Sequence, residues 1–96
     1  MFYVYIIKSI STNRYYIGHT ANLEDRLTRH NENRSKATKG RGPWKLVITF
    51  PCQTKTQAYQ LEMKLKSFKN TQKAIGYLET LAQGYSTITK KMIRIC

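Results

Sequence analysis

The chain has 96 residues, of which 17 are lysine or arginine and five are acidic, so its formal net charge is +12. This length allows one small domain with a modest core, and a hydrophobic content of 41% argues against a disordered chain. No apolar run approaches the roughly 20 residues of a membrane span, and the N-terminus lacks the regions of a signal peptide, so we expect a cytoplasmic protein.

The chain begins with a predicted β-hairpin. Residues 2–8 are β-branched or aromatic on both faces, which predicts a central strand that is covered on both sides. A polar turn leads to a second strand over residues 14–19, antiparallel to the first. Tyr16 and Gly18 share one face of this second strand, and Gly18 leaves the backbone open to close approach by a ligand.

A helix is predicted next, with Asn22 as its N-cap and an end near Asn33. Helical spacing puts Arg26 and His30 on or beside the buried stripe, whereas Arg29 points elsewhere. An arginine at the edge of a buried face must find an anion.

Residues 34–45 are predicted to form a loop, because they contain two glycines and a proline. The loop carries five basic residues and no acid: Arg34, Lys36, Lys39, Arg41 and Lys45. Together with the net charge, this favours nucleic acid as the partner. An anionic membrane surface is the second choice, although the sequence shows no strongly amphipathic basic helix. A generically basic soluble protein is the third reading.

A third strand over residues 44–50 should end at Pro51. The second helix would begin at a capping box of Thr54 and Gln57 and run to about Phe68. Its residue Glu62 lies on the stripe that faces the core.

A third helix is predicted over about residues 71–83, capped by Asn70 and stopped by Gly84. The expected fold is therefore α+β: a three-stranded mixed or antiparallel sheet flanked by about three helices, within residues 1–84. Residues 85–96 form a basic tail that is either an added strand or a flexible arm. The two cysteines have no metal-ligand spacing, so free thiols are expected.

Four side chains fall where a core would prefer apolar atoms: Tyr5, Tyr16, Arg26 and Glu62. They have an ordinary explanation, in which the tyrosines are half-buried sheet residues and Arg26 pairs with Glu62 between two helices. As a set with basic surroundings they favour a functional site.

Phosphodiester hydrolysis would use this set. Arg26 can stabilise charge on the phosphoryl oxygens, and Glu62 is an oxygen ligand for one hard divalent ion. The scarcity of acids in the sequence favours one metal ion over two. Candidates for handling the proton of water or of the leaving oxygen are Tyr5, Tyr16, His19 and His30.

A family resemblance rests on these residues. Tyr3-Val4-Tyr5 and Tyr16-Ile17-Gly18 resemble the paired motifs of GIY-YIG nucleases, and Arg26 and His30 follow at the family's spacing. The segment from Ala58 through Glu62 to Lys66 is similar to the helix that carries the family's metal-binding glutamate. The resemblance covers about residues 2–75 and is closest to small stand-alone members related to the N-terminal nuclease domain of the bacterial ABC excinuclease.

The resemblance implies DNA cleavage that depends on a divalent metal, in a setting such as DNA repair or recombination. It implies that Tyr5 and Tyr16 act on the water side, that Arg26 stabilises the phosphate, that Glu62 holds Mg²⁺ or Mn²⁺ and that His30 supports the site. His19 stands where excinuclease members carry a lysine, which leaves the protonation scheme open. The residues expected to contact nucleic acid are Gly18, Arg29, Arg34, Lys36, Lys39, Arg41 and Lys66.

Two further alternatives remain at this stage. The chain carries no separate DNA-binding domain, so affinity would come from the basic surface or from a partner protein. A module that binds nucleic acid without cutting it, and a nuclease directed at RNA, are the other readings of the sequence.

Overall fold

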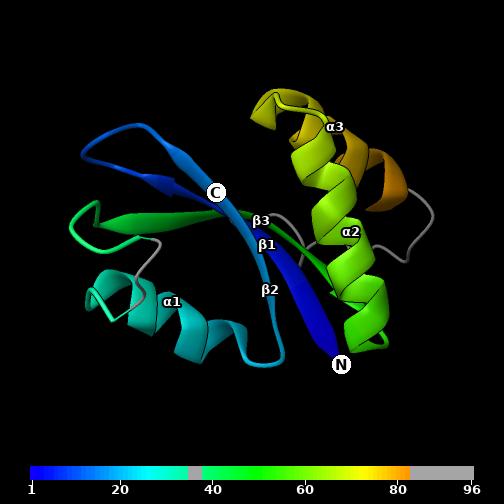
Figure 1. The fold of residues 1–96 in the computed structure, drawn as a ribbon, viewed down its shortest axis with the longest axis horizontal. Coiled ribbons are helices and arrows are strands. Elements are labelled where there is room, and N and C mark those ends of the chain that lie inside the picture. Colours follow the sequence, from blue (N-terminus) through cyan, green and yellow to red (C-terminus); the bar gives the residue numbers. More distant parts are fainter. Residues whose placement is uncertain (35–37, 83–96) are drawn as a thin grey trace.

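The computed structural model describes residues 1–34 and 38–82 (Figure 1). Six elements follow one another along the chain in the order ββαβαα. They are β1 (Phe2–Ser9), β2 (Tyr15–Thr20), α1 (Leu23–Asn31), β3 (Trp44–Cys52), α2 (Lys55–Ser67) and α3 (Thr71–Ala82). This arrangement confirms the predicted α+β class.

The three strands form one antiparallel sheet in the order β2-β1-β3. Strand β1 is central, as its apolar faces predicted, and Val4 to Ile7 are fully buried. Strands β1 and β2 form the predicted hairpin, in which Tyr5 lies opposite Gly18. Strand β2 is therefore an edge strand, and both of its faces carry side chains of the candidate site.

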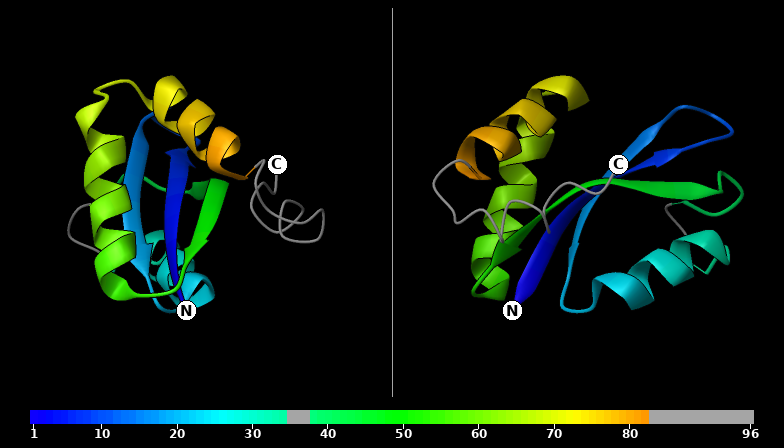
Figure 2. Two further views of the ribbon diagram at one scale, coloured as in Figure 1. Left: turned by 90° about the vertical axis from the view of Figure 1, so that its right-hand side faces the viewer. Right: turned by 180° about the vertical axis from the view of Figure 1, so that it is seen from behind.

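Helices cover both faces of the sheet (Figures 1 and 2). On one face α2 and α3 pack on Val4, Ile6 and the matching face of β3, which makes the larger core. On the other face Leu23 and Leu27 of α1 pack on a smaller cluster that includes Tyr5. Burial of these apolar side chains, at about 25 cal/mol for each Å², holds the helices on the sheet.

Helix α1 begins where the sequence predicted, because the Asn22 side chain accepts the N–H of Asp25 at 3.0 Å. The helix ends at Asn31, two residues before the expected end. Asn33 has φ of 61° in the left-handed region, which a continuing helix cannot contain.

The N-terminal caps of α2 and α3 confirm where the sequence predicted these helices to begin. Thr54 accepts the N–H of Gln57, and the Gln57 side chain accepts the N–H of Gln53 rather than that of Thr54, so the capping box is shifted by one residue. Asn70 accepts the N–H of Lys73 at the start of α3. Each helix thus has a polar side chain at its first exposed N–H groups.

The prediction that Pro51 ends the third strand was wrong, since β3 continues to Cys52. Strand β3 lies at the other edge of the sheet. A proline is tolerated in an edge strand, because its missing N–H can face away from the sheet. Cys52 is a buried free thiol, and burial raises its pKa.

The expected stop at Gly84 and the basic tail of residues 85–96 lie outside the described residues, so the division of the chain at residue 84 stays a prediction. Among residues 1–34 and 38–82, every helix is too short or too polar to span a bilayer.

Candidate active site

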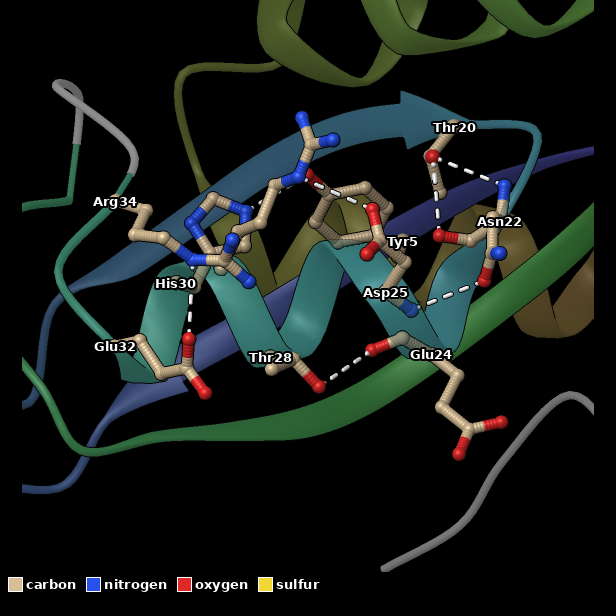
Figure 3. A network of polar contacts seen from close by, with 10 residues as sticks. Tyr5, Thr20, Asn22, Glu24, Asp25, Thr28, His30, Glu32 and Arg34 are labelled. Atoms are coloured by element: carbon tan, nitrogen blue, oxygen red, sulfur yellow. Dashed lines mark hydrogen bonds and ion pairs between the residues drawn. The ribbon is translucent and has the colours of Figure 1, made fainter.

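The face of the sheet under α1 holds a buried chain of polar side chains. The Oη of Tyr5 lies 2.9 Å from Nε2 of His30, and Nδ1 of His30 lies 2.6 Å from Oγ1 of Thr38. All three residues are at most 1% exposed. Figure 3 shows Tyr5 and His30 facing each other beside helix α1. Because buried polar atoms need partners, this chain fixes the positions of both rings.

Gly18 makes room for the Tyr5 ring. A Cβ atom at position 18 would lie 2.7 Å from Oη of Tyr5 and 2.9 Å from its Cζ, which no side chain can occupy without a shift. The sequence suggested that Gly18 leaves space for a ligand. The structure fills that space with the protein's own phenol, so Gly18 has a packing role, and its contact with nucleic acid stays a prediction.

Both members of the Tyr5–His30 pair are neutral. Burial raises the pKa of Tyr5 to about 12, the neighbouring Tyr16 and Glu62 add to the rise, and Arg26 opposes it. Burial also lowers the pKa of His30, and the Arg26 guanidinium adds to that effect. A neutral imidazole donates at one nitrogen and accepts at the other, so His30 can serve Tyr5 and Thr38 together in either tautomer.

The lowered pKa of His30 makes folding sensitive to acid. The unfolded state takes up a proton near pH 6.5, whereas the folded state resists it, so stability is full above pH 6.5 and falls as the pH drops below that value. We expect the loss to reach at most about 1.4 kcal/mol for each pH unit. Urea unfolding of wild type and of His30→Asn between pH 7.5 and pH 5 measures it, and His30→Asn should lose this part of the dependence. An NMR titration of His30 with a midpoint at or above 6.5 would contradict this prediction.

The other face of β2 carries an ion-pair cluster around Glu62. The Oε1 atom of Glu62 lies 2.7 Å from Nδ1 of His19, and its Oε2 lies 2.8 Å from Nζ of Lys66. Glu62 is only 8% exposed, so its carboxylate needs these cations. The ordinary explanation for the sequence pattern, an ion pair between Glu62 and Arg26, is not what the structure contains.

Arg26 is the cation on the α1 side, and it is partly buried. Its charge acts on the pKa values of both Tyr5 and His30, so it lies beside the buried chain. In the part of the chain that the structure describes, no carboxylate forms an ion pair with Arg26. The guanidinium therefore retains donors for an anion from outside.

The two clusters adjoin across the edge strand. Glu62 on α2 contributes to the raised pKa of Tyr5, although α2 covers the face of the sheet opposite to the one that carries the Tyr5 side chain. Tyr16 belongs to the α1 side, where its ring centroid lies 5.1 Å from that of His30 and 6.3 Å from that of Tyr5. The side chains next to β2 thus include two tyrosines, the buried carboxylate of Glu62 and Arg26. Within the described ranges, Arg26 has no carboxylate partner.

The donors fit one hard divalent ion better than a closed metal cage. No group of three or more His, Cys, Asp or Glu side chains gathers within residues 1–34 and 38–82. A Mg²⁺ ion keeps several waters and needs only one or two carboxylates together with substrate phosphates. Glu62 already attracts two cationic groups, and the half-exposed Lys66 side chain can leave, so Glu62 could hold such an ion.

The remaining described side chains that were predicted to contact nucleic acid are exposed basic residues at the end of α1 and in the loop before β3. Arg29 pairs with Asp25 at 3.1 Å and Arg34 with Glu32 at 3.0 Å, and all four side chains are exposed. Figure 3 shows the Arg34–Glu32 pair at the end of α1. Lys39 and Arg41 are exposed in the loop before β3, and Lys36 lies outside the described residues.

One residue and one ion pair were missed by the sequence reasoning. Thr38 holds the far side of His30, and nothing in a loop of mixed polar residues identifies it. The pairing of Lys66 with Glu62 follows the i,i+4 spacing of a helix, which the sequence does show, although there Lys66 was treated only as a nucleic-acid contact.

Comparison with known proteins identifies the family of this chain. The model of the GIY-YIG catalytic domain matches residues 1–75. The UPF0213 protein SH2523 of Staphylococcus haemolyticus is 39% identical over 72 residues, which are 74% of this chain and 87% of that protein. The UPF0213 protein CPE1444 of Clostridium perfringens is 40% identical over 74 residues, which are 76% of this chain and 78% of that protein.

Among solved structures, the solution NMR structure of the UPF0213 protein BH0048 from Bacillus halodurans matches with a TM-score of 0.47 and 30% identity. The match covers 84% of this chain and 85% of that chain. The family model spans both tyrosine motifs, the arginine helix and the glutamate helix. The chain therefore belongs to the GIY-YIG nuclease family.

Proposed function

We propose that this protein is an endonuclease that hydrolyses phosphodiester bonds of DNA with one Mg²⁺ or Mn²⁺ ion at Glu62. The observation that carries the proposal is the pair of groups at β2: an arginine without a carboxylate partner among the described residues, and a carboxylate that is only 8% exposed. Family membership supports the same chemistry.

Arg26 binds the scissile phosphate in this proposal. Its donors are free of carboxylates within the described chain, and α1 holds it beside the buried Tyr5–His30 pair. A fixed guanidinium stabilises the charge that grows on the phosphoryl oxygens and needs no reorganisation during the reaction. Partial burial strengthens this interaction, because less water screens it.

Glu62 would hold the divalent ion, which neutralises phosphate charge and makes a bound water more acidic when it is present. Nδ1 of His19 donates to Oε1 of the Glu62 carboxylate at 2.7 Å and so orients it. A group that orients a metal ligand commonly affects the site almost as much as the ligand. His19 is in this way a positioning residue.

The two tyrosines receive different roles. Tyr5 is fully buried and its pKa is about 12, so its hydroxyl keeps its proton and positions the site through His30. Tyr16 is only partly buried and packs against both rings. We therefore assign to Tyr16 the direct contact with water or with the leaving oxygen.

A cleavage assay tests the proposed function. Purified protein is incubated with labelled duplex, nicked, branched, flapped and single-stranded DNA and with RNA, each with Mg²⁺, with Mn²⁺ or with EDTA. We expect cleavage of at least one DNA substrate that depends on the divalent ion. Binding of DNA without cleavage of any substrate would instead identify a non-catalytic binding module, and cleavage of RNA alone would change the substrate class.

The basic loop gives a prediction about affinity. Replacing Lys39 and Arg41 by glutamine should weaken binding of all DNA sequences and lower the slope of log affinity against log salt by about 1 for each phosphate neutralised by these residues in the wild type. Binding isotherms between 50 and 300 mM salt, roughly the range over which such slopes are read, measure this effect. The same change at the exposed Lys55 and Lys73, outside the loop, is the matched control. An unchanged slope would show that the loop does not contact phosphate.

The remaining parts of the proposal concern the setting. DNA repair or recombination in the cytoplasm is the role that such an activity suggests, and a partner protein would add selectivity to the contacts of the basic surface. Co-purification of the tagged chain with and without nuclease treatment tests the partner, because a contact bridged only by DNA would disappear after treatment.

A further inference from the structure

The Lys66 side chain has two possible partners. Its Nζ lies 2.8 Å from Oε2 of Glu62, one helical turn away on α2. The same side chain lines a cavity of about 370 Å³ between β2 and the start of α3, together with Tyr15, Tyr16 and Lys69. Lys66 thus stands between the proposed metal ligand and a pocket that also borders Tyr16.

A divalent ion and the Lys66 ammonium compete for Oε2. An ion bound to a carboxylate oxygen sits about 2.0–2.1 Å from it, and the ammonium already lies at hydrogen-bond distance from the same atom. Two cations at such a separation repel strongly in a partly buried site. Binding of the ion at Oε2 therefore favours the departure of Lys66.

Lys66 is the partner of Glu62 that can move. Its side chain is 46% exposed, whereas that of His19 is 20% exposed. The ammonium sits on a flexible four-carbon stem, while the imidazole of His19 is fixed by strand β2 and by its contact with Tyr59. The adjoining cavity is lined by a second lysine, Lys69, and also by Tyr16, so two ammonium groups border it. These donors suit a phosphate group.

We propose that Lys66 is an exchangeable counter-ion, which neutralises Glu62 in the free protein and moves to a phosphate in the Tyr16–Lys69 cavity when a divalent ion binds Glu62. This inference rests on the proposed function. It makes the two ligands cooperative: a phosphate that takes Lys66 frees Glu62 for the ion, and the ion releases Lys66 for the phosphate. By linkage, each ligand raises the affinity for the other by the same factor.

Binding of Mn²⁺, followed by the EPR signal of the free ion at constant ionic strength, tests the exchange without any cleavage. We expect Lys66→Met to bind Mn²⁺ about fivefold more tightly than wild type, the factor that loss of a partly exposed ion pair allows. Lys64→Met is the matched control: it removes the same charge from the same helix, but Lys64 lies over Phe68 and Tyr77 instead of Glu62. Equal or weaker binding by Lys66→Met would overturn the inference.

Sulfate serves as the phosphate probe, with chloride in the reference buffer and with the free Mn²⁺ concentration corrected for sulfate complexes. Sulfate should tighten Mn²⁺ binding to wild type, and this gain should vanish in Lys66→Met and shrink in Lys69→Met. If sulfate does not tighten Mn²⁺ binding to wild type, the proposed exchange is overturned. Glu62→Gln separates the two failures: if it binds Mn²⁺ as wild type does, the proposed metal site also fails, whereas a loss of binding limits the failure to Lys66.

Discussion

Replacing Glu62 by glutamine is expected to lower the rate of divalent-dependent DNA cleavage by about a thousandfold or more, the size of effect that several kcal/mol of metal-assisted stabilisation implies. Glutamine has almost the same shape as glutamate but carries no charge. It can neither hold the ion nor neutralise Lys66, which lies 2.8 Å from the carboxylate. Single-turnover cleavage with Mg²⁺ and with Mn²⁺ measures the loss.

The control for this variant is Glu24→Gln, which removes the same charge from an exposed position on α1. It should cleave at nearly the wild-type rate. Thermal unfolding of both variants separates a loss of chemistry from a loss of folding, since Glu62 is buried and Glu24 is not. A Glu62→Gln protein that folds and cleaves like wild type would remove Glu62 from the mechanism.

Replacing Arg26 by alanine is expected to lower the cleavage rate at saturating DNA by about 10²–10³-fold, as loss of a fixed donor to a developing oxyanion commonly does. Arg26→Lys should recover part of the rate, because an ammonium supplies the charge without the planar fork. Removing the Arg26 charge should also raise the pKa of His30, which this charge lowers. An NMR titration of His30 reads that shift independently of activity.

Arg29→Ala is the matched control for Arg26→Ala. Arg29 lies one turn farther along the same helix, is exposed and already pairs with Asp25. At saturating DNA its replacement should leave the rate within about threefold of wild type, since exposed ion pairs contribute little. Equal losses in both variants would point to a general effect of positive charge on α1 and would contradict a special role for Arg26.

The sequence predicted the sheet well because its signals are local. A strand that is apolar on both faces must be covered on both sides, and β1 is the central strand of the sheet. The caps at Asn22, Thr54 and Asn70 also depend on neighbours within a few residues, and all three cap helices in the structure. The prediction at Pro51 was wrong because the sequence does not show that β3 is an edge strand, which only the tertiary structure reveals.

The candidate site was predicted as a set of residues but not as a network. Spacing along one helix suggested that Glu62 faces the core, and it is buried there. Which cation it meets depends on how α1 and α2 pack on opposite faces of the sheet, and this selects His19 and Lys66 in place of Arg26. The contact of His30 with Thr38 likewise depends on the path of a loop that carries no periodic signal.

The closeness of Tyr5 to Gly18 has a consequence for anyone who alters this protein. The two positions face each other across the hairpin, and the phenol at one occupies the volume that a methyl group at the other would need. A library that varies them one at a time should find few side chains at position 18, because each would displace the Tyr5 ring. Varied together, a smaller residue at position 5 leaves room for a larger one at position 18. The two residues fill one shared volume, so they should be redesigned together.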